Sequence, residues 1–163
     1  MPWKIFRFKP YSYKKTDVGS FLQVNINDPW TKIRSKQHDT TADEFEIDSY
    51  DVPIVKLDDY IDEKSIKRIN LLKIDTQGTE DEVLKGCVNA LKANIIDYVE
   101  LELIIKGPYN KTLSFKDIEN ILNPFEYKLY GIKAGSNYYD MPILQFDLLF
   151  ARKDCYIPGK YSE

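Results

Sequence analysis

One stretch of the chain, residues 71–86 (LLKIDTQGTEDEVLKG), constrains the fold more than any other. A short apolar run ends in Asp75, a glycine turn follows, and a helical pattern then begins with three acidic residues in succession. This pattern is typical of a strand at 71–75 that passes through a tight turn into a helix at 79–93. A predicted strand at 97–104 and a predicted helix at 114–122 continue the alternation. The order predicts an α/β fold in which right-handed crossovers join parallel strands.

Two final strands are predicted at 127–133 and 143–150, close enough in sequence to pair antiparallel. Ser114 is the expected N-cap of the helix that precedes them, because its hydroxyl can accept a hydrogen bond from a free backbone N–H of the first turn.

Upstream of this region the pattern is less regular. Short strands are predicted at 3–8, 20–26 and 53–57, and a short helix or turn follows from Leu57. Residues 27–51 are predicted to form a long irregular stretch, which in a compact domain is either functional or poorly ordered.

Composition excludes several classes of protein. The 163 residues fit one compact domain, and a net charge of −3 with both signs interspersed argues against nucleic acid as the main partner. No apolar run approaches the roughly 20 residues that span a bilayer, and the N-terminal sequence does not resemble a secretion signal. Cys87 and Cys155 lie far apart without metal-ligand spacing, so we expect free thiols and a cytoplasmic location.

The residues around the glycine turn have two interpretations. Thr79 followed three residues later by Glu82 predicts a capping box, and Glu80, Asp81 and Glu82 would complement the dipole of the helix. Asp75 closes an otherwise apolar strand, at the strand end where ligands bind in parallel α/β sheets. From the pattern alone, Asp75 is either a cap of the turn or a functional residue.

Residues 71–86 resemble the K-I-D-x-[EQ]-G-x-E-x-x-V-L-x-G block of the FkbM-type methyltransferases. Weaker segments resemble the same family and follow in the same order: VKLDDYI at 55–61, DYVELEL at 97–103, PYNKTLSFKDIENIL at 108–122, EYKLYGI at 126–132 and FDLLF at 146–150. The resemblance covers residues 50–150, and the central block is its most specific part.

The resemblance implies an S-adenosylmethionine-dependent methyltransferase that acts on a hydroxyl of a small molecule or glycan, such as a sugar. It implies an α/β, Rossmann-like sheet that is mostly parallel with an antiparallel final strand pair. The methyltransferase core would occupy residues 53–152, after an irregular N-terminal segment at 1–52 and before a C-terminal tail at 153–163.

The resemblance also implies site residues. The candidate catalytic carboxylates are Asp75 and Glu102, either of which could remove the proton of the acceptor hydroxyl or orient that hydroxyl. The candidate donor-binding residues are Lys73, Asp75 and Gln77, and the candidate acceptor-binding residues are Glu80 and Tyr109. No cluster of ligands in the sequence requires a metal.

A donor-binding domain of this kind needs a glycine-rich turn after its first strand, and the sequence contains no G-x-G. The segment TDVGSFLQVN at 16–25 begins like the family's D-V-G-A-N-x-G, but no second glycine follows and its apolar pattern favours a strand. We therefore expect the C-terminal part of the domain without its first two strands, with 3–8 as a remnant of the third. A truncated reading frame, a subdomain completed by another chain and a non-catalytic remnant stay open as explanations, and so does enzymatic activity itself.

Without those two strands, the strand at 71–75 would lie at a sheet edge with unpaired backbone groups and an exposed apolar face. This gives the alternative function, a non-catalytic interaction module that pairs its open edge with a partner chain or with a second copy of itself.

Overall fold

The computed structural model describes the following residues: 6–8, 11–13, 19–37, 39–44, 46–49, 51–105, 107–134 and 145–155. The predicted strand at 143–150 therefore begins outside the described residues, as does the predicted strand at 3–8.

The main sheet has four strands in the order β6-β7-β9-β8. They span Ile69–Ile74 (β6), Ile96–Ile104 (β7), Gln145–Arg152 (β9) and Tyr127–Ala134 (β8). Strands β6 and β7 are parallel, whereas β9 is antiparallel to both β7 and β8. The antiparallel final pair is confirmed, but a mostly parallel sheet is not, because β9 inserts between β7 and β8.

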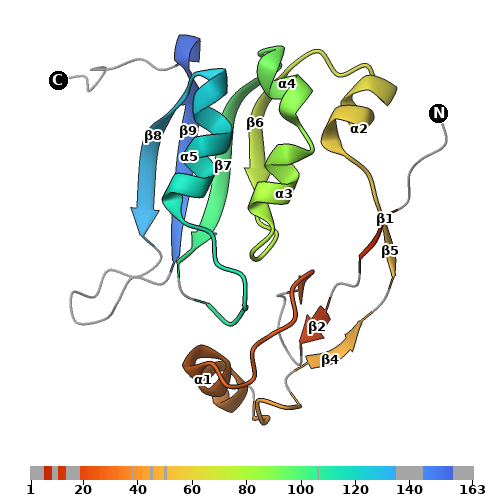
Figure 1. The fold of residues 1–163 in the computed structure, drawn as a ribbon, viewed down its shortest axis with the longest axis vertical. Coiled ribbons are helices and arrows are strands. Elements are labelled where there is room, and N and C mark those ends of the chain that lie inside the picture. Colours follow the sequence, from red (N-terminus) through yellow and green to blue (C-terminus); the bar gives the residue numbers. More distant parts are fainter. Residues whose placement is uncertain are drawn as a thin grey trace.

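Three helices lie on one face of this sheet, as Figure 1 shows. They are α3 (Glu80–Lys85), α4 (Val88–Lys92) and α5 (Phe115–Leu122), and α5 continues into the 3-10 turn η1 (Asn123–Phe125). Ser114 caps α5 as expected, in a full capping box with Asp117. A second 3-10 turn, η2 (Lys153–Cys155), follows β9.

The continuous helix predicted at 79–93 is wrong, because the chain breaks at Gly86 and Cys87 into α3 and α4. The break is held by helix α2 (Leu57–Glu63). The backbone N–H of Asp58 donates to the Gly86 carbonyl oxygen, and the Asp58 carboxylate accepts from the N–H groups of Asn89 and Ala90. Asp58 therefore acts as an N-cap of α4 that is supplied by another helix.

The core lies between these helices and the sheet. Fully buried side chains come from every layer, including Leu84, Leu91, Val99, Leu101 and Ile118. Because side chains alternate along a strand, the burial of Leu101 toward the helices places its neighbours Glu100 and Glu102 on the opposite face of β7. We call the sheet face away from α3, α4 and α5 the open face.

The N-terminal part forms two small antiparallel units. Strand β1 (Phe6–Phe8) pairs with β5 (Val52–Ile54), and β2 (Tyr11–Tyr13) lies between β3 (Gly19–Ser20) and β4 (Glu46–Ser49). The strand predicted at 20–26 is wrong beyond Ser20, where the chain bends and only Val24 makes an isolated bridge, to Tyr109.

The irregular stretch predicted at 27–51 is also wrong, because it contains α1 (Pro29–Gln37) as well as β4. Asp28 explains how this helix begins: its carboxylate accepts from the N–H of Trp30, and its carbonyl oxygen accepts from the N–H of Lys32. Pro29 fits the first turn because its missing N–H would have no helical partner there.

Strand β6 is an edge of the main sheet within the described residues, where its strand partner is β7. Leu71 on its open face is 49% exposed, and Tyr130 on the open face of β8 is 47% exposed. An edge with exposed apolar side chains is what the sequence predicted for this strand.

Candidate active site

Asp75, Gln77 and Glu102 meet at the carboxyl ends of the parallel strands β6 and β7. The side-chain nitrogen Nε2 of Gln77 donates to Asp75 Oδ1 at 2.9 Å and to Glu102 Oε2 at 2.7 Å. One amide therefore bridges two carboxylates that come from neighbouring strands. The structure brings together the two carboxylates that the sequence selected as catalytic candidates.

Glu102 is half-buried, and it has a second amide partner, since Gln145 Nε2 of β9 donates to Glu102 Oε1 at 2.9 Å. Burial raises the pKa of Glu102 above its ordinary value, and the negative charge of Asp75 raises it further. The hydrogen bond from Gln77 acts in the opposite direction, because it stabilises the charged form. Glu102 is thus a stronger base than a carboxylate in water.

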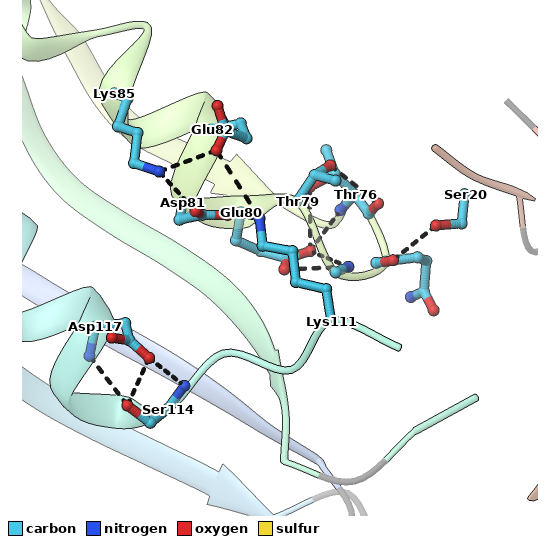
Figure 2. Close-up of polar contacts among 12 residues, drawn as sticks. Ser20, Thr76, Thr79, Glu80, Asp81, Glu82, Lys85, Lys111, Ser114 and Asp117 are labelled. Carbon is cyan, nitrogen blue, oxygen red and sulfur yellow. Dashed lines mark hydrogen bonds and ion pairs between the residues drawn. The ribbon is translucent and has the colours of Figure 1, made fainter. Parts of the chain in front are cut away.

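Glu80 closes the turn that follows β6, as Figure 2 shows. Glu80 is 1% exposed, and its carboxylate accepts from three groups, the N–H and hydroxyl of Thr76 and the N–H of Gly78, at 3.0–3.1 Å. The oxygens are therefore committed to the turn itself. This geometry favours a role of Glu80 in shaping the site over direct contact with an acceptor.

The capping box predicted for Thr79 and Glu82 is wrong. The Thr79 side chain makes no capping hydrogen bond, and its hydroxyl lies 3.5 Å from the carbonyl oxygen of Thr76. Glu82 instead pairs with Lys85 at 2.9 Å. The prediction failed because the carboxylate of Glu80, not the Thr79 hydroxyl, accepts the hydrogen bonds of the backbone N–H groups in this turn.

The turn has a left-handed backbone at two consecutive residues, Gln77 (φ 54°) and Gly78 (φ 107°). A Cβ atom on Gly78 would lie 2.7 Å from Leu22 Cδ1 and 3.3 Å from the ring of Tyr109. Ser20 fixes the turn from outside, because its hydroxyl donates to the Gln77 carbonyl oxygen at 2.8 Å (Figure 2). These contacts define the backbone position from which the Gln77 amide reaches both carboxylates.

Tyr109 is 6% exposed and packs against this turn. Burial raises the pKa of its hydroxyl to about 12, although a hydrogen bond with Ser20 favours the charged form. The charges of Glu80, Glu102 and Asp75 raise this pKa further, so the hydroxyl is neutral near neutral pH.

Lys73 lies two residues before Asp75 on β6 and therefore on the same face. Its ammonium is 3.7 Å from a carboxylate oxygen of Glu100, the residue opposite it on β7, and its side chain is 59% exposed. The contacts of Gln77 join Asp75 to Glu102 and do not include Lys73.

The model of the FkbM methyltransferase domain family matches residues 8–129, which is 122 of the 163 residues. The chain belongs to the FkbM methyltransferase family. The match begins well before residue 50, where the resemblance read from the motifs began. The N-terminal part that contains Ser20 and Val24 is therefore included in the matched region.

A curated relative of this FkbM-family chain is "Methyltransferase 1" of Beauveria bassiana (strain ARSEF 2860), which is 29% identical over 92 residues. The alignment covers 56% of this chain and 32% of the relative. The chain thus spans about a third of the length of the curated relative that it matches.

Sequence reasoning missed two residues of this FkbM-family site, Ser20 and Gln145. Both come from segments distant in sequence from the central block, and neither has a local pattern that indicates a role. Gln145 could have been found only from the register of β9 against β7, in which it lies opposite Ile104 on the same face as Glu102.

The described residues of this FkbM-family chain show no metal-binding cluster and no membrane-spanning helix. Within them, no group of three or more His, Cys, Asp or Glu side chains is placed to hold a metal ion. No helix in the described part of the chain is both long enough and apolar enough to cross a membrane.

Proposed function

We propose that this chain acts in S-adenosylmethionine-dependent methylation of a hydroxyl group on a sugar or another small-molecule or glycan acceptor. The observation that carries the proposal is the bridge of Gln77 between Asp75 and Glu102. It lies beyond the carboxyl ends of two parallel strands, where α/β proteins bind ligands.

Glu102 is proposed as the general base. Methylation of a hydroxyl requires removal of its proton, and a half-buried carboxylate with a raised pKa is better matched to that task near neutral pH. Asp75 is proposed to orient the acceptor or the donor, because its exposed carboxylate lies beside Glu102 and shares the Gln77 amide. The acceptor hydroxyl would give its proton to a carboxylate oxygen of Glu102, and the acceptor oxygen would take the methyl group that the donor releases from its sulfur.

The residues at the strand ends fit the chemistry of S-adenosylmethionine. When bound, this donor supplies a methyl group that its sulfonium charge makes electrophilic. Asp75 offers carboxylate oxygens to the donor's amino group or hydroxyls, Gln77 offers an amide, and Lys73 offers an ammonium to its carboxylate. The concentration of negative charge at Asp75 and Glu102 also suits a cationic sulfonium.

Tyr109 and Glu80 are proposed to shape the acceptor side of the site. Tyr109 packs on Gly78 and fixes the turn, and Glu80 holds the same turn from inside.

We place this activity in a core at 53–152, between the segments 1–52 and 153–163, and in the cytoplasm; the boundaries and the location stay predictions.

Calorimetric titration with S-adenosylmethionine tests donor binding. The proposal expects binding that Asp75→Asn weakens at least about tenfold, the effect of losing one charge-assisted contact. Asp62→Asn is the matched control, because Asp62 is an exposed acid on α2, away from the site. Binding only by a version extended upstream in its reading frame would support truncation, and binding by neither version would rule out the proposal.

A second candidate function is an interaction module that pairs β6 with a strand of a second copy of this chain. The exposed Leu71 and the edge position of β6 within the described residues favour it. Mass measurement by light scattering separates the two functions. A dimer that Leu71→Lys dissociates supports the module, and a monomer at all concentrations counts against it.

A further inference from the structure

Glu102 is surrounded by negative charge from three sides. Asp75 follows the end of β6, Asp147 lies directly opposite on β9, and Glu80 is the first residue of α3. All three negative charges raise the pKa of Glu102, in addition to burial. Asp147 pairs with Lys133 of the outer strand β8, whose ammonium is 3.8 Å from a carboxylate oxygen of Asp147. Repulsion from these neighbours would turn an untethered Glu102 carboxylate away from Asp75 and Asp147.

Two neutral amides hold this carboxylate in place. Gln77 donates to Oε2 at 2.7 Å, and Gln145 donates to Oε1 at 2.9 Å. The two donors come from different elements, the turn after β6 and the start of β9, and each binds a different oxygen. A carboxylate oxygen can accept two hydrogen bonds, so each oxygen of Glu102 can still accept one more, for example from an acceptor hydroxyl.

We propose that Gln145 is a positioning residue for the methyl-transfer base Glu102, which it holds together with Gln77 in a clamp of two neutral amides. This inference rests on the proposed role of Glu102 as base. Gln145 does not itself need to touch donor or acceptor, since it acts through Glu102.

The neutrality of the clamp has a chemical consequence. A lysine or arginine at position 145 would also orient Glu102, but its charge would stabilise the carboxylate and lower its basicity. A glutamine at this position fixes the orientation of the Glu102 carboxylate and changes its proton affinity less than a charged side chain would. The clamp thus orients Glu102 and leaves it able to accept a proton from an acceptor hydroxyl.

The test is the pKa of Glu102, measured by NMR from the carboxyl carbon resonances of the ¹³C-labelled chain without donor or acceptor. Gln145→Leu removes a hydrogen bond to the charged form, so the pKa of Glu102 should rise by about half a unit to one unit. Gln145→Lys should lower it, and so should Asp147→Asn, which removes a like charge. Gln23→Leu is the same substitution at another exposed glutamine and should leave the pKa unchanged.

Opposite shifts for the leucine and lysine variants, with backbone spectra that match the wild type elsewhere, would support the clamp. An unchanged Glu102 pKa in Gln145→Leu would overturn it, and so would equal shifts in Gln145→Leu and Gln23→Leu. The titration needs no ligand, so it is independent of donor binding. A chain that binds no donor but shows these shifts would refute the proposed function and keep the clamp.

Discussion

At the scale of single residues, the buried carboxylate of Glu80 is the acceptor that keeps the turn after β6 closed. Glu80→Ala would leave the N–H groups of Thr76 and Gly78 without this acceptor, which should cost about 3 kcal/mol of unfolding free energy. Urea denaturation measures the loss. Glu82→Ala, two residues on and with a side chain 56% exposed, should cost less than about 1 kcal/mol. Equal losses in the two variants would show that Glu80 does not support the turn.

Gly78 is required by backbone conformation and by space. Gly78→Ala should destabilise the fold by about 1–3 kcal/mol, because φ is +107° and a Cβ would collide with Leu22. Gly131→Ala is the control, since its Cβ would meet only Leu149 Cβ at 3.9 Å. Thermal unfolding of both variants checks this difference, and a stable Gly78→Ala variant would mean that the turn is not fixed as described.

The pattern alone singled out Asp75, because it closes an apolar run at a strand end, where a charge needs an explanation. Glu102 became a candidate only through the resemblance to the FkbM-type family. The sequence could not identify the role of Glu80. From the sequence, Glu80 could equally well complement the helix dipole or accept hydrogen bonds from the turn. The positive φ values of Gln77 and Gly78, which the sequence does not show, turn the backbone N–H groups of the turn toward its carboxylate. Gln145 depends on strand register, which local sequence does not encode.

At the scale of elements, the α2–α4 contact rests on Asp58. Asp58→Ala should lower the unfolding free energy by about 1–2 kcal/mol, because α4 would lose the carboxylate that accepts from Asn89 and Ala90. Asp59→Ala removes an exposed neighbouring acid and should have little effect. Chemical denaturation compares the two, and similar values would contradict the capping role.

Asp81 ties α3 to the loop before α5, and this contact predicts a pH dependence. Burial alone would raise the pKa of Asp81, but hydrogen bonds from Lys111 (2.6 Å) and Lys85 (2.8 Å) hold it below its ordinary value (Figure 2). Because the folded pKa is depressed, the contact contributes stability above pH about 4, the unfolded value, and loses it as the pH falls through the folded pKa. Asp81→Asn should therefore flatten the acid limb of a stability-against-pH curve.

The control for this pH effect is Asp59→Asn, a substitution of an exposed acid that should leave the shape of the acid limb unchanged. If Asp81→Asn kept the wild-type dependence below pH about 4, the two lysine contacts would not stabilise the folded state.

The strands of the main sheet and helix α5 follow their sequence patterns closely, whereas the predicted helix at 79–93 and the elements upstream of residue 53 do not. The amphipathic pattern and Ser114 cap of α5 are local signals, so they were sufficient to predict the helix. The break between α3 and α4 depends on Asp58, which lies 28 residues before Gly86, and α1 has a weak apolar pattern. Contacts over such distances override local propensity.

At the scale of the whole molecule, the main sheet is covered on one face by α3, α4 and α5, and its other face is the open face (Figure 1). The two small N-terminal units are separate from this sheet. The α/β class and the final antiparallel pair followed from the order of patterns along the chain. The insertion of β9 between β7 and β8 did not, because sheet order is decided by long-range pairing. The candidate site lies at the sheet end where the N-terminal segment contacts the turn after β6 through Ser20 and contacts Tyr109 through Val24.

The most direct test of methyl-donor binding at the Asp75–Gln77–Glu102 cluster is residue-resolved NMR. S-adenosylmethionine, or its stable demethylated product, would be titrated into ¹⁵N-labelled chain while the backbone amides and the Gln77 side-chain amide are followed. We expect saturable shifts at Lys73, Asp75 and Gln77, with the side-chain amide of Gln77 among the largest. Saturating donor that shifts none of these resonances, or only resonances far from this sheet end, would contradict this expectation.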